Sequence, residues 1–383
     1  MLVVGASIAG VTFAEALRTE GFDGHITIIG DEPYLPYVRP PLSKQVLMGE
    51  WDQAHVEILR EHQFLDKRIL IHLNQRAVAV DLVRKVVSTQ WEEFAFDVLV
   101  IATGSKARIL DEYKSLRTFR TLDDALELRA ALSAGIHLGI VGAGVLGSEI
   151  ATAAMKLGSR VTLMGKPKEI TFGALGAKLT GLLEPLHRNH GVELRLGLTI
   201  DEIIAKGDKT HMRLESGESV DFDLAIAVVG TKPCVDWLEG SGLDLTSGVV
   251  CDSNGQANED VFAIGDAAAW PNPFDGSPLR IEHQSGAIEQ AVAVARHLVT
   301  GEKSGTPTPI FWSDIHDVKI KAAGWFSGAE LEAVDSGSDS GFLFVSKQNG
   351  LVQGVISWNA SNSSFRQARK LIEGSLEAFQ DAK

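Results

Sequence analysis

The feature that most constrains this chain is a glycine-rich turn directly after its first apolar segment. Residues 2–10 read LVVGASIAG, so a predicted strand runs through a turn into an alanine-rich helix predicted over 11–18. Gly5 lets the strand turn sharply, Gly10 lets the helix pack closely on the sheet, and Ser7 stands where the G-x-G-x-x-G pattern has its middle glycine. The N–H groups of such a turn, with the helix dipole behind them, suit a dinucleotide pyrophosphate.

The residues that follow the first helix strengthen this interpretation. A second strand, predicted over 25–29, ends in Gly30, Asp31 and Glu32. An acid at that point can accept hydrogen bonds from a ribose diol. The alternative is a plain strand-helix-strand unit whose glycines only make the turn and whose two acids are solvated. The order of strand, glycines, helix, strand and acid favours the dinucleotide site.

A second glycine-rich unit appears in the middle of the chain. Residues 137–149 read HLGIVGAGVLGSE and contain all three glycines of the pattern, Gly142, Gly144 and Gly147. A helix predicted over 148–157 and a strand over 160–164 follow. Gly5 and Gly142 are 137 positions apart, about one domain, so two such units imply two bound dinucleotides. The sequence therefore predicts an α/β fold with two Rossmann-like dinucleotide-binding domains.

The second unit lacks the acid that a ribose 2′-hydroxyl requires. Its second strand ends in Gly165, Lys166, Pro167 and Lys168. The two lysines can attract a 2′-phosphate, or they can be ordinary surface charges. The choice between NADH and NADPH is therefore open at this stage.

Other segments also end in polar or glycine residues where ligands bind to open α/β sheets. Residues 33–44 form a proline-rich loop that places Arg39 and Lys44 at the crevice, unless both are solvated cations of a connector. A strand predicted over 96–102 runs into Thr103 and Gly104. Residues 261–267 contain Asp266 in a Gly-Asp turn, where the carboxylate can bind a sugar-alcohol hydroxyl or cap the next segment.

The remaining pattern completes the two units and adds a third. Helices are predicted over 42–48, 121–134, 175–190 and 284–298, and strands over 69–73, 78–82, 211–215 and 224–229. From residue 306 the pattern changes to strands over 310–312, 318–322, 342–346 and 351–357, with Asn349-Gly350 as a type I′ hairpin and 335–341 as a polar loop. A helix over 364–379 ends this small α+β domain.

Composition bounds the class of protein. A chain of 383 residues implies two or three domains, and a formal charge of −14 argues against a general nucleic-acid or anionic-membrane surface. The two cysteines, Cys234 and Cys251, are too few for a disulfide framework and not spaced as a C-x-x-C pair, so we expect buried thiols. No apolar run reaches the ~20 residues of a membrane span, and the first strand begins at Met1, so a cytoplasmic location is expected.

The order of motifs along the whole chain resembles that of the FAD-dependent ferredoxin reductases that serve bacterial ring-hydroxylating dioxygenases (Rieske oxygenases) and class I cytochromes P450. These are glutathione-reductase-like flavoproteins. The diagnostic pieces are the two glycine motifs, the loop 39–44 (RPPLSK), the Ala-Thr-Gly of 102–104, Gly265-Asp266 and the element 311–314 (FWSD). The loop and the Trp-Ser-Asp element are the specific ones.

The resemblance implies a domain plan and two cofactors. It implies a discontinuous FAD-binding domain over 1–108 and 233–303, an NAD(P)H-binding domain over 109–232 and a C-terminal α+β domain over 304–383. FAD and NADH or NADPH are the implied cofactors, NADH being slightly favoured, and no metal is expected. The implied partner is a 2Fe–2S ferredoxin, and the chain would be a monomer or weak homodimer that serves an oxygenase of aromatic hydrocarbon catabolism.

The resemblance also implies roles for individual residues. Lys44 would lie near flavin N5 and pair with Glu149 close to the nicotinamide, and Trp312 would lie beside the isoalloxazine; these three are the candidate catalytic residues. The helix that begins near Gln284 would direct its positive end at the flavin pyrimidine. The candidate cofactor-binding residues are Gly5, Ser7, Ile8, Ala9, Gly10, Asp31, Glu32, Arg39, Lys44, Ala77, Thr103, Gly104, Gly142, Gly144, Val145, Leu146, Gly147, Glu149, Lys166, Gly230, Asp266, Gln284 and Trp312.

Three departures from the family pattern concern local charge, nucleotide choice and partner surface. Val38 replaces an aspartate common in the loop, and Gly165 replaces the acid expected of NADH-specific members. Ile315-His316 follows Trp-Ser-Asp where a glutamine and an aromatic residue are frequent, which bears on the redox-partner surface.

The predicted function is an NAD(P)H:ferredoxin reductase. Without a dithiol beside the flavin, electrons must leave to an outside acceptor. Rubredoxin or quinone-like acceptors are alternatives, and a redox-sensing flavoprotein resembling apoptosis-inducing factor is a rival from another class. Coenzyme A disulfide reductases and NADH oxidases use a cysteine near the position of Ser43 and are disfavoured. The net acidity requires a local basic patch for an acidic ferredoxin; Arg366, Arg369 and Lys370 are candidates, or a plain solvated helix face.

Overall fold

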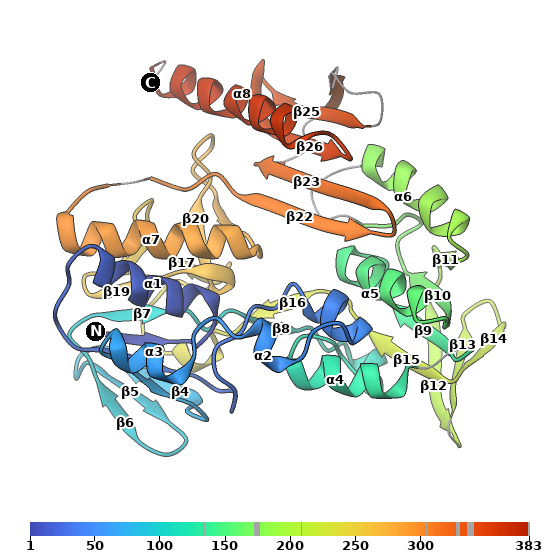
Figure 1. Ribbon diagram of the computed structural model, residues 1–383, viewed down its shortest axis with the longest axis horizontal. Coiled ribbons are helices and arrows are strands. Elements are labelled where there is room, and N and C mark those ends of the chain that lie inside the picture. Colours follow the sequence, from blue (N-terminus) through green and yellow to red (C-terminus); the bar gives the residue numbers. More distant parts are fainter. Residues whose placement is uncertain are drawn as a thin grey trace. The chain divides into compact units, whose positions relative to one another are not determined.

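The computed structural model describes residues 1–132, 135–171, 177–207, 209–303, 305–326, 330–334 and 341–381. The chain divides into two compact units, each discontinuous in sequence. Unit 1 comprises Met1–Val38, Val56–Lys106 and Pro233–Phe311, and unit 2 comprises Arg39–His55, Ala107–Lys232 and Trp312–Lys383. The predicted α/β class is confirmed, since parallel sheets with flanking helices form both units (Figure 1).

The central sheet of unit 1 has six strands in the order β18-β19-β7-β1-β2-β3. The five strands from β19 to β3 are parallel to one another, and the edge strand β18 is antiparallel to β19. Continuous apolar triplets such as LVV suit strands that are buried on both faces, and β1, β7 and β19 are buried throughout, whereas the edge strands β3 and β18 are partly exposed. The strands are β1 (Leu2–Val4), β2 (Ile26–Ile29), β3 (Ile69–His72), β7 (Leu99–Ile101), β18 (Gln256–Asn258) and β19 (Val261–Ala263).

Helices α1 (Ile8–Thr19) and α7 (Gln284–Thr300) pack against each other in unit 1 (Figure 1). Small residues allow this contact, because Ala14, Ala291 and Ala295 are fully buried. The first helix begins three residues earlier than the sequence predicted, so Ile8, Ala9 and Gly10 form its first turn. Unit 1 also contains α3 (Glu61–Asp66), β4 (Ala77–Asp81), β5 (Val86–Thr89), β6 (Glu93–Ala95), β17 (Val249–Val250), β20 (Ala268–Pro271), β21 (Pro278–Arg280) and the 3₁₀ turns η4 (Asp236–Leu238) and η5 (Gly265–Ala267).

Unit 2 holds a second parallel sheet in the order β11-β10-β9-β15. All five residues of β9 are buried, and α5 follows this strand directly. The elements are β9 (His137–Val141), α5 (Val145–Lys156), β10 (Arg160–Gly165), α6 (Ala177–Asn189), β11 (Glu193–Leu196), β15 (Leu224–Ala227) and the antiparallel strands β12 (Ile200–Lys206), β13 (Lys209–Leu214) and β14 (Ser219–Phe222).

The C-terminal part of unit 2 is a five-stranded sheet in the order β22-β23-β26-β25-β24, covered by α8. The predicted Asn349-Gly350 hairpin is confirmed: both residues have positive φ, as a type I′ turn requires. The elements are β22 (Ile310–Ile315), β23 (Val318–Gly324), β24 (Glu330–Val334), β25 (Phe342–Gln348), β26 (Leu351–Trp358) and α8 (Asn362–Asp381).

Some predicted boundaries were wrong. The helix expected over 121–134 is α4 (Leu122–Ala131), with Thr121 as its N-cap, and it ends because Leu132 is extended. Residues 133–134, 172–176 and 335–340, parts of two predicted helices and a predicted loop, lie outside the described residues. The helix expected over 42–48 begins as a π-helical turn, η1 (Leu42–Val46), which follows the two prolines of the loop.

The remaining short elements connect these parts. Strands β8 (Ser105–Ala107) and β16 (Thr231–Pro233) and helix α2 (Gln53–Val56) lie where the chain passes from one unit to the other. The 3₁₀ turn η2 (Asp111–Tyr113) belongs to unit 2. Among the helices of the described residues, none combines the length and apolarity of a membrane span.

Candidate functional site

The carboxyl ends of the parallel strands of unit 1 form one row. Val4 is in register with Ile29 and Ile101, and Ile101 is in register with Ala263. The residues that follow these strands therefore share one edge of the sheet. They are Gly5, Gly30, Ala102 and Ile264, each leading into a segment that the sequence singled out. Open α/β sheets bind ligands at this edge, where the strand order reverses.

The first glycine motif has the geometry of a phosphate-binding turn. Gly5 has φ +127°, and a Cβ there would lie 2.0 Å from the carbonyl oxygen of Ala102. A Cβ on Gly10 would lie 2.1 Å from the carbonyl oxygen of Gly5, so only glycine allows α1 to approach the strand this closely. Ser7 is the N-cap of α1, yet its side chain makes no capping hydrogen bond. The N–H groups of the first turn are therefore left for a ligand such as a pyrophosphate.

The two candidate ribose-binding acids differ in their surroundings. Glu32 accepts a hydrogen bond from the hydroxyl group of Tyr37. Asp31 is exposed, and its Oδ2 lies 4.0 Å from Nε of Arg76. Ala77, the first residue of β4, is partly buried in the same unit. Both acids follow β2 as expected, and either carboxylate can accept from a ribose hydroxyl.

Asp266 is held by a serine that the sequence did not single out. Its Oδ2 accepts a hydrogen bond of 2.9 Å from Ser105 Oγ, which fixes the carboxylate beside the carboxyl edge of the sheet. The adjoining Gly265 N–H donates to Oε1 of the buried Gln290 on α7 over 2.8 Å. Thr103 Oγ1 donates to the Cys234 carbonyl over 2.7 Å. Ser105 and Gln290 are therefore supporting residues that only tertiary contacts reveal.

Helix α7 also begins without a side-chain cap. Its N-cap is His283 and its first residue is Gln284, as the predicted pyrimidine-facing helix requires. Burial lowers the pKa of His283, and its Nδ1 has no hydrogen-bond partner among the described residues. The His283 ring lies against Phe311, with 4.8 Å between ring centroids. A buried polar nitrogen without a partner at an uncapped helix start fits a site that a polar ligand completes.

The second glycine motif repeats this geometry in unit 2. Gly142 has φ +123°, and a Cβ on Gly147 would lie 2.1 Å from the Gly142 carbonyl oxygen. Gly144, the N-cap of α5, has no side chain to cap the helix, so the N–H groups at Val145 and Leu146 face the turn. Gly230 has φ +102° and open space around its Cα. Both glycine motifs therefore build the same kind of cradle.

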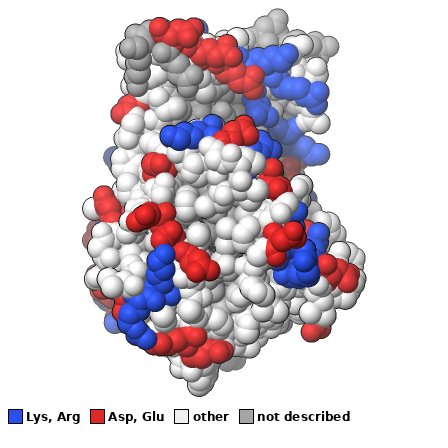
Figure 2. Space-filling view, turned by 90° about the vertical axis from the view of Figure 1, so that its left-hand side faces the viewer, with Lys and Arg blue, Asp and Glu red and all other residues white. Residues whose placement is uncertain are grey.

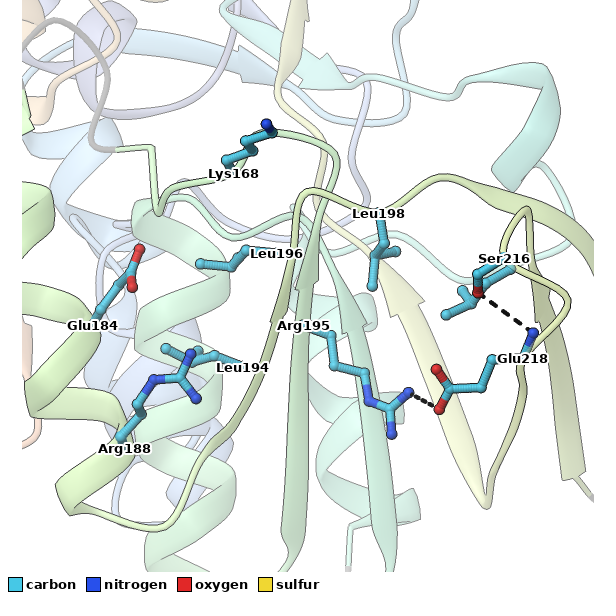
Figure 3. Close-up of a pocket in the computed structure, with 10 residues that line it drawn as sticks. Lys168, Glu184, Arg188, Leu194, Arg195, Leu196, Leu198, Ser216 and Glu218 are labelled. Atoms are coloured by element: carbon cyan, nitrogen blue, oxygen red, sulfur yellow. Dashed lines mark hydrogen bonds and ion pairs between the residues drawn. The ribbon is translucent and has the colours of Figure 1, made fainter.

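A cavity in unit 2 is bordered by β11, α6 and the turn after β13. It has a volume of about 570 Å³ and is lined by Lys168, Glu184, Arg188, Leu194, Arg195, Leu196, Leu198, Leu214, Ser216 and Glu218. Figure 3 shows charged side chains from α6 and from β11 around it, and Arg195 Nη1 lies 2.6 Å from Glu218 Oε1. Lys166 and Lys168 are exposed, and Lys168 reaches the cavity. This cavity is large enough for part of a nucleotide.

Glu149 is held by three polar side chains within unit 2. Its Oε1 lies 2.6 Å from Lys44 Nζ and accepts a 2.6 Å hydrogen bond from Ser313 Oγ, while Oε2 accepts a 2.6 Å hydrogen bond from Ser43 Oγ. The Glu149 residue is 7% exposed, and the two serines are buried as well. The predicted pairing of Lys44 with Glu149 is present, because η1 packs against α5. The two serines were quoted in the sequence motifs but not assigned a role.

Two further candidate residues lie on or beside the chain segments that supply the two serines. Trp312 stands on β22 with 42% of its surface exposed. Arg39 Nη1 donates to the Arg120 carbonyl over 3.0 Å. Both belong to unit 2, whereas the first glycine motif and Asp266 belong to unit 1. Their expected meeting at a flavin ring is therefore still a prediction.

Three histidines form a cluster in unit 2. His316 Nε2 lies 3.0 Å from His187 Nδ1, and the His190 ring stacks on the His316 ring with 4.1 Å between centroids. Burial lowers the pKa of His187 to about 3 and that of His316 to about 4, and the neighbouring histidines add to both shifts. Asp317 and Lys156 act on His316 in opposite directions, the first raising and the second lowering its pKa. His187 and His316 are therefore neutral at physiological pH.

The cysteine prediction was half right. Cys251 is buried, and burial raises its pKa to about 12. Cys234, directly after β16, is only partly buried. Neither cysteine is part of a disulfide.

Two parallel sheets, each with a glycine-rich turn at its carboxyl edge, are the architecture of an oxidoreductase built for two dinucleotides. The chain belongs to the pyridine nucleotide-disulphide oxidoreductase family, whose model matches residues 1–293. Residues 310–382 match the reductase C-terminal family.

Relatives cover nearly the whole chain. The ferredoxin reductase component of a chlorobenzene dioxygenase from Cupriavidus sp. (strain PS12) is 33% identical over 380 residues, which is 97% of this chain and 92% of the relative. A rubredoxin-NAD(+) reductase from Pseudomonas putida is 33% identical over 85% of this chain and 86% of its own. The solved covalent putidaredoxin reductase–putidaredoxin complex superposes with a TM-score of 0.91, at 28% identity, over 97% of this chain and 92% of the solved chain.

Proposed function

We propose that this chain is a flavoprotein that passes electrons from a pyridine nucleotide through FAD to a 2Fe–2S ferredoxin. The observation that carries the proposal is the pair of uncapped glycine-rich helix starts, one in each unit. Relatives named as ferredoxin reductase components of dioxygenase systems, similar over nearly the whole chain, support the acceptor. Electron supply to a Rieske dioxygenase is supported by the same relatives, and supply to a cytochrome P450 by the similar solved ferredoxin reductase of the CYP199A2 system.

The residues of unit 1 fit FAD. The turn from Gly5 to Gly10 would hold the pyrophosphate, and Asp31 or Glu32 the adenosine ribose. Asp266, held by Ser105, would accept from the ribitol. Bound FAD would supply the chemistry of accepting a hydride from the nicotinamide and releasing its electrons singly.

The residues of unit 2 fit the nicotinamide nucleotide. The turn from Gly142 to Gly147 would hold its pyrophosphate, and Glu149 lies within the first turns of α5, where the nicotinamide half is expected. There Glu149 and Lys44 would orient the nicotinamide ring and exclude water, and Trp312 would cover the flavin.

Nucleotide choice would depend on the strand end at Gly165. A ribose with a free 2′-hydroxyl has no acid partner there, whereas Lys166 and Lys168 can pair with a 2′-phosphate. In favour of NADH, relatives of this chain include proteins named as ferredoxin–NAD(+) reductases. We propose NADH as the preferred donor, with NADPH accepted, because two exposed lysines bind phosphate weakly at physiological salt.

The electron acceptor has one alternative with a specific observation behind it. The rubredoxin-NAD(+) reductase of Pseudomonas putida is 33% identical over 85% of this chain, and the chlorobenzene dioxygenase component is 33% identical over 97% of it. On the face shown in Figure 2, a group of basic side chains lies at the upper right beside acidic ones, and the two signs are mixed over the lower part. Arg366 and Lys370 are exposed one turn apart on α8 and could contact an acidic iron–sulfur protein.

The experiment is anaerobic stopped-flow reduction of the yellow holoprotein by NADH and by NADPH, followed at the flavin absorption band. Fast bleaching with NADH, and cytochrome c reduction that depends on added ferredoxin, are the expected results. Reduction that depends on rubredoxin instead would identify the alternative acceptor. Slow turnover with every acceptor, together with dimerisation on NADH addition, would favour a redox sensor and refute the proposal.

A further inference from the structure

The side chain of Glu149 is held by hydroxyl groups from two distant segments. Ser43 comes from η1 and donates to Oε2, and Ser313 comes from β22 and donates to Oε1, each over 2.6 Å. Lys44 Nζ completes the set, 2.6 Å from Oε1. Ser43 is 3% and Ser313 1% exposed, so neither hydroxyl has water as an alternative partner. The carboxylate therefore has a donor on each oxygen and a single orientation.

The position of Ser313 follows from the alternation of β22. Trp312 and Asp314 are exposed, whereas Ser313 and Ile315 are buried. The same strand contacts α5 a second time, because the His316 N–H donates to Thr152 Oγ1 over 3.2 Å. Glu149 and Thr152 lie three residues apart on one face of α5. Glu149 contacts Ser313, and Thr152 contacts His316, three positions further along the chain. Two hydrogen bonds therefore join the C-terminal sheet to α5.

Other buried serines of this sheet have no such contact. Ser346 and Ser357 are each 1% exposed, and their hydroxyl groups have no hydrogen-bond partner among the described residues. Burial of a serine in this part of the molecule therefore does not by itself produce a hydrogen bond to a carboxylate. The Ser313 contact depends on its position on β22 opposite Glu149.

We propose that Ser313 and Ser43 are positioning residues for hydride transfer, acting through Glu149 by fixing its carboxylate and, through it, the ammonium group of Lys44. This inference rests on the proposed function, which places Glu149 close to the nicotinamide. Through Ser313 the C-terminal domain contributes directly to the nucleotide half of the site. Loss of Ser43 leaves Oε2 without its hydroxyl donor, and loss of Ser313 leaves Oε1 with Lys44 alone, so either change weakens the restraint on the carboxylate.

The test is anaerobic flavin reduction by NADH in single-turnover experiments on purified holoprotein. The variants are Ser313→Ala, Ser43→Ala and the conservative Ser313→Thr, which keeps the hydroxyl group. Ser357→Ala is the matched control, equally buried in the same sheet. Reduction of each variant by dithionite, which needs no nucleotide site, shows that its flavin is bound and reducible.

We expect Ser313→Ala and Ser43→Ala each to lower the limiting rate of flavin reduction about tenfold, the size expected for the loss of a hydrogen bond to a charged group. The NADH dissociation constant should change much less than the limiting rate, because the pyrophosphate cradle is intact. Ser313→Thr should recover most of the rate, and Ser357→Ala should match the wild type. In a Glu149→Gln background, Ser313→Ala should add less than about a twofold effect, since the residue it acts through is already altered.

Wild-type rates in both alanine variants would overturn the inference while leaving the proposed function intact. An equal loss on Ser313→Ala in the wild-type and Glu149→Gln backgrounds would also overturn it, because the serine would then act independently of Glu149. If Ser313→Ala does not fold, Ser43→Ala tests the same carboxylate from the other side. Failure of NADH and NADPH to reduce the wild-type flavin would instead refute the proposed function on which the inference rests.

Discussion

Replacing Gly147 by alanine should destabilise the nucleotide-binding part of unit 2, although alanine is the better helix former. The added Cβ would lie 2.1 Å from the Gly142 carbonyl oxygen, and real Cβ contacts are essentially never under 3.0 Å. Helix α5 must therefore move away from the turn by almost 1 Å. Overpacking of this kind costs about 1–3 kcal/mol, against a helix-propensity gain of about 1 kcal/mol, so a net loss of up to about 2 kcal/mol is expected.

Gly181 supplies the matched control within the same unit. It lies in helix α6, is exposed, and a Cβ there meets nothing within 4 Å. Gly181→Ala should therefore gain up to about 1 kcal/mol from helix propensity alone. The same chemical change thus has opposite expected signs at two helical glycines.

Urea unfolding of the two variants and the wild type, followed by far-ultraviolet circular dichroism, measures the difference. We expect the Gly147→Ala midpoint to fall below the wild type and the Gly181→Ala midpoint to equal or exceed it. NADH affinity should also fall in Gly147→Ala, because the first-turn N–H groups of α5 shift away from the pyrophosphate. A Gly147→Ala protein as stable as Gly181→Ala would refute the close-approach argument.

Three further predictions follow from particular side chains. Burial holds the pKa of His187 to about 3 and that of His316 to about 4, whereas a histidine of the unfolded chain has a pKa of ~6.5 and is protonated first as the pH falls. The free energy of unfolding should therefore be full above pH ~6.5 and fall by about 1.4 kcal/mol per pH unit for each histidine as the pH drops toward 4. An unchanged urea midpoint between pH 7.5 and 5.5 would contradict this. Cys251, with its pKa raised to about 12, should react with a thiol reagent only after unfolding in a Cys234→Ser background; rapid native labelling would contradict its burial. Thr121→Ala removes the N-cap of α4 and should cost about 1 kcal/mol in the urea experiment, whereas Thr121→Ser should be near neutral.

Local patterns were enough to predict much of the fold. An apolar strand before a glycine turn leaves few options, because the turn needs the positive φ of Gly5 and the close approach at Gly10. The Asn349-Gly350 hairpin was predictable for the same reason, since two successive positive φ values favour these residues. Helix ends were predicted less well: α4 ends at Ala131 through the extended conformation of Leu132, which no local composition required.

The candidate site was only partly predictable. The pairing of Lys44 with Glu149 was expected from resemblance, but the hydroxyl donors Ser43 and Ser313 were not assigned, because a serine in a motif carries no mark of what it contacts. Ser105 beside Asp266 and Gln290 on the Gly265 N–H were missed for the same reason. Each of these contacts joins residues at least 25 positions apart in the chain.

By itself the sequence determined the elements that depend on backbone geometry: two glycine cradles, their strands and the hairpin. These are local because a φ angle or a missing Cβ acts on its immediate neighbours. Only the tertiary structure decided which hydroxyl groups surround Glu149, because that depends on how β22 packs against α5. It likewise decided which histidines surround His316, because those come from α6 and the residue after it. A side chain's partners are set by the packing of segments far apart in the chain, and no local pattern in the sequence records that packing.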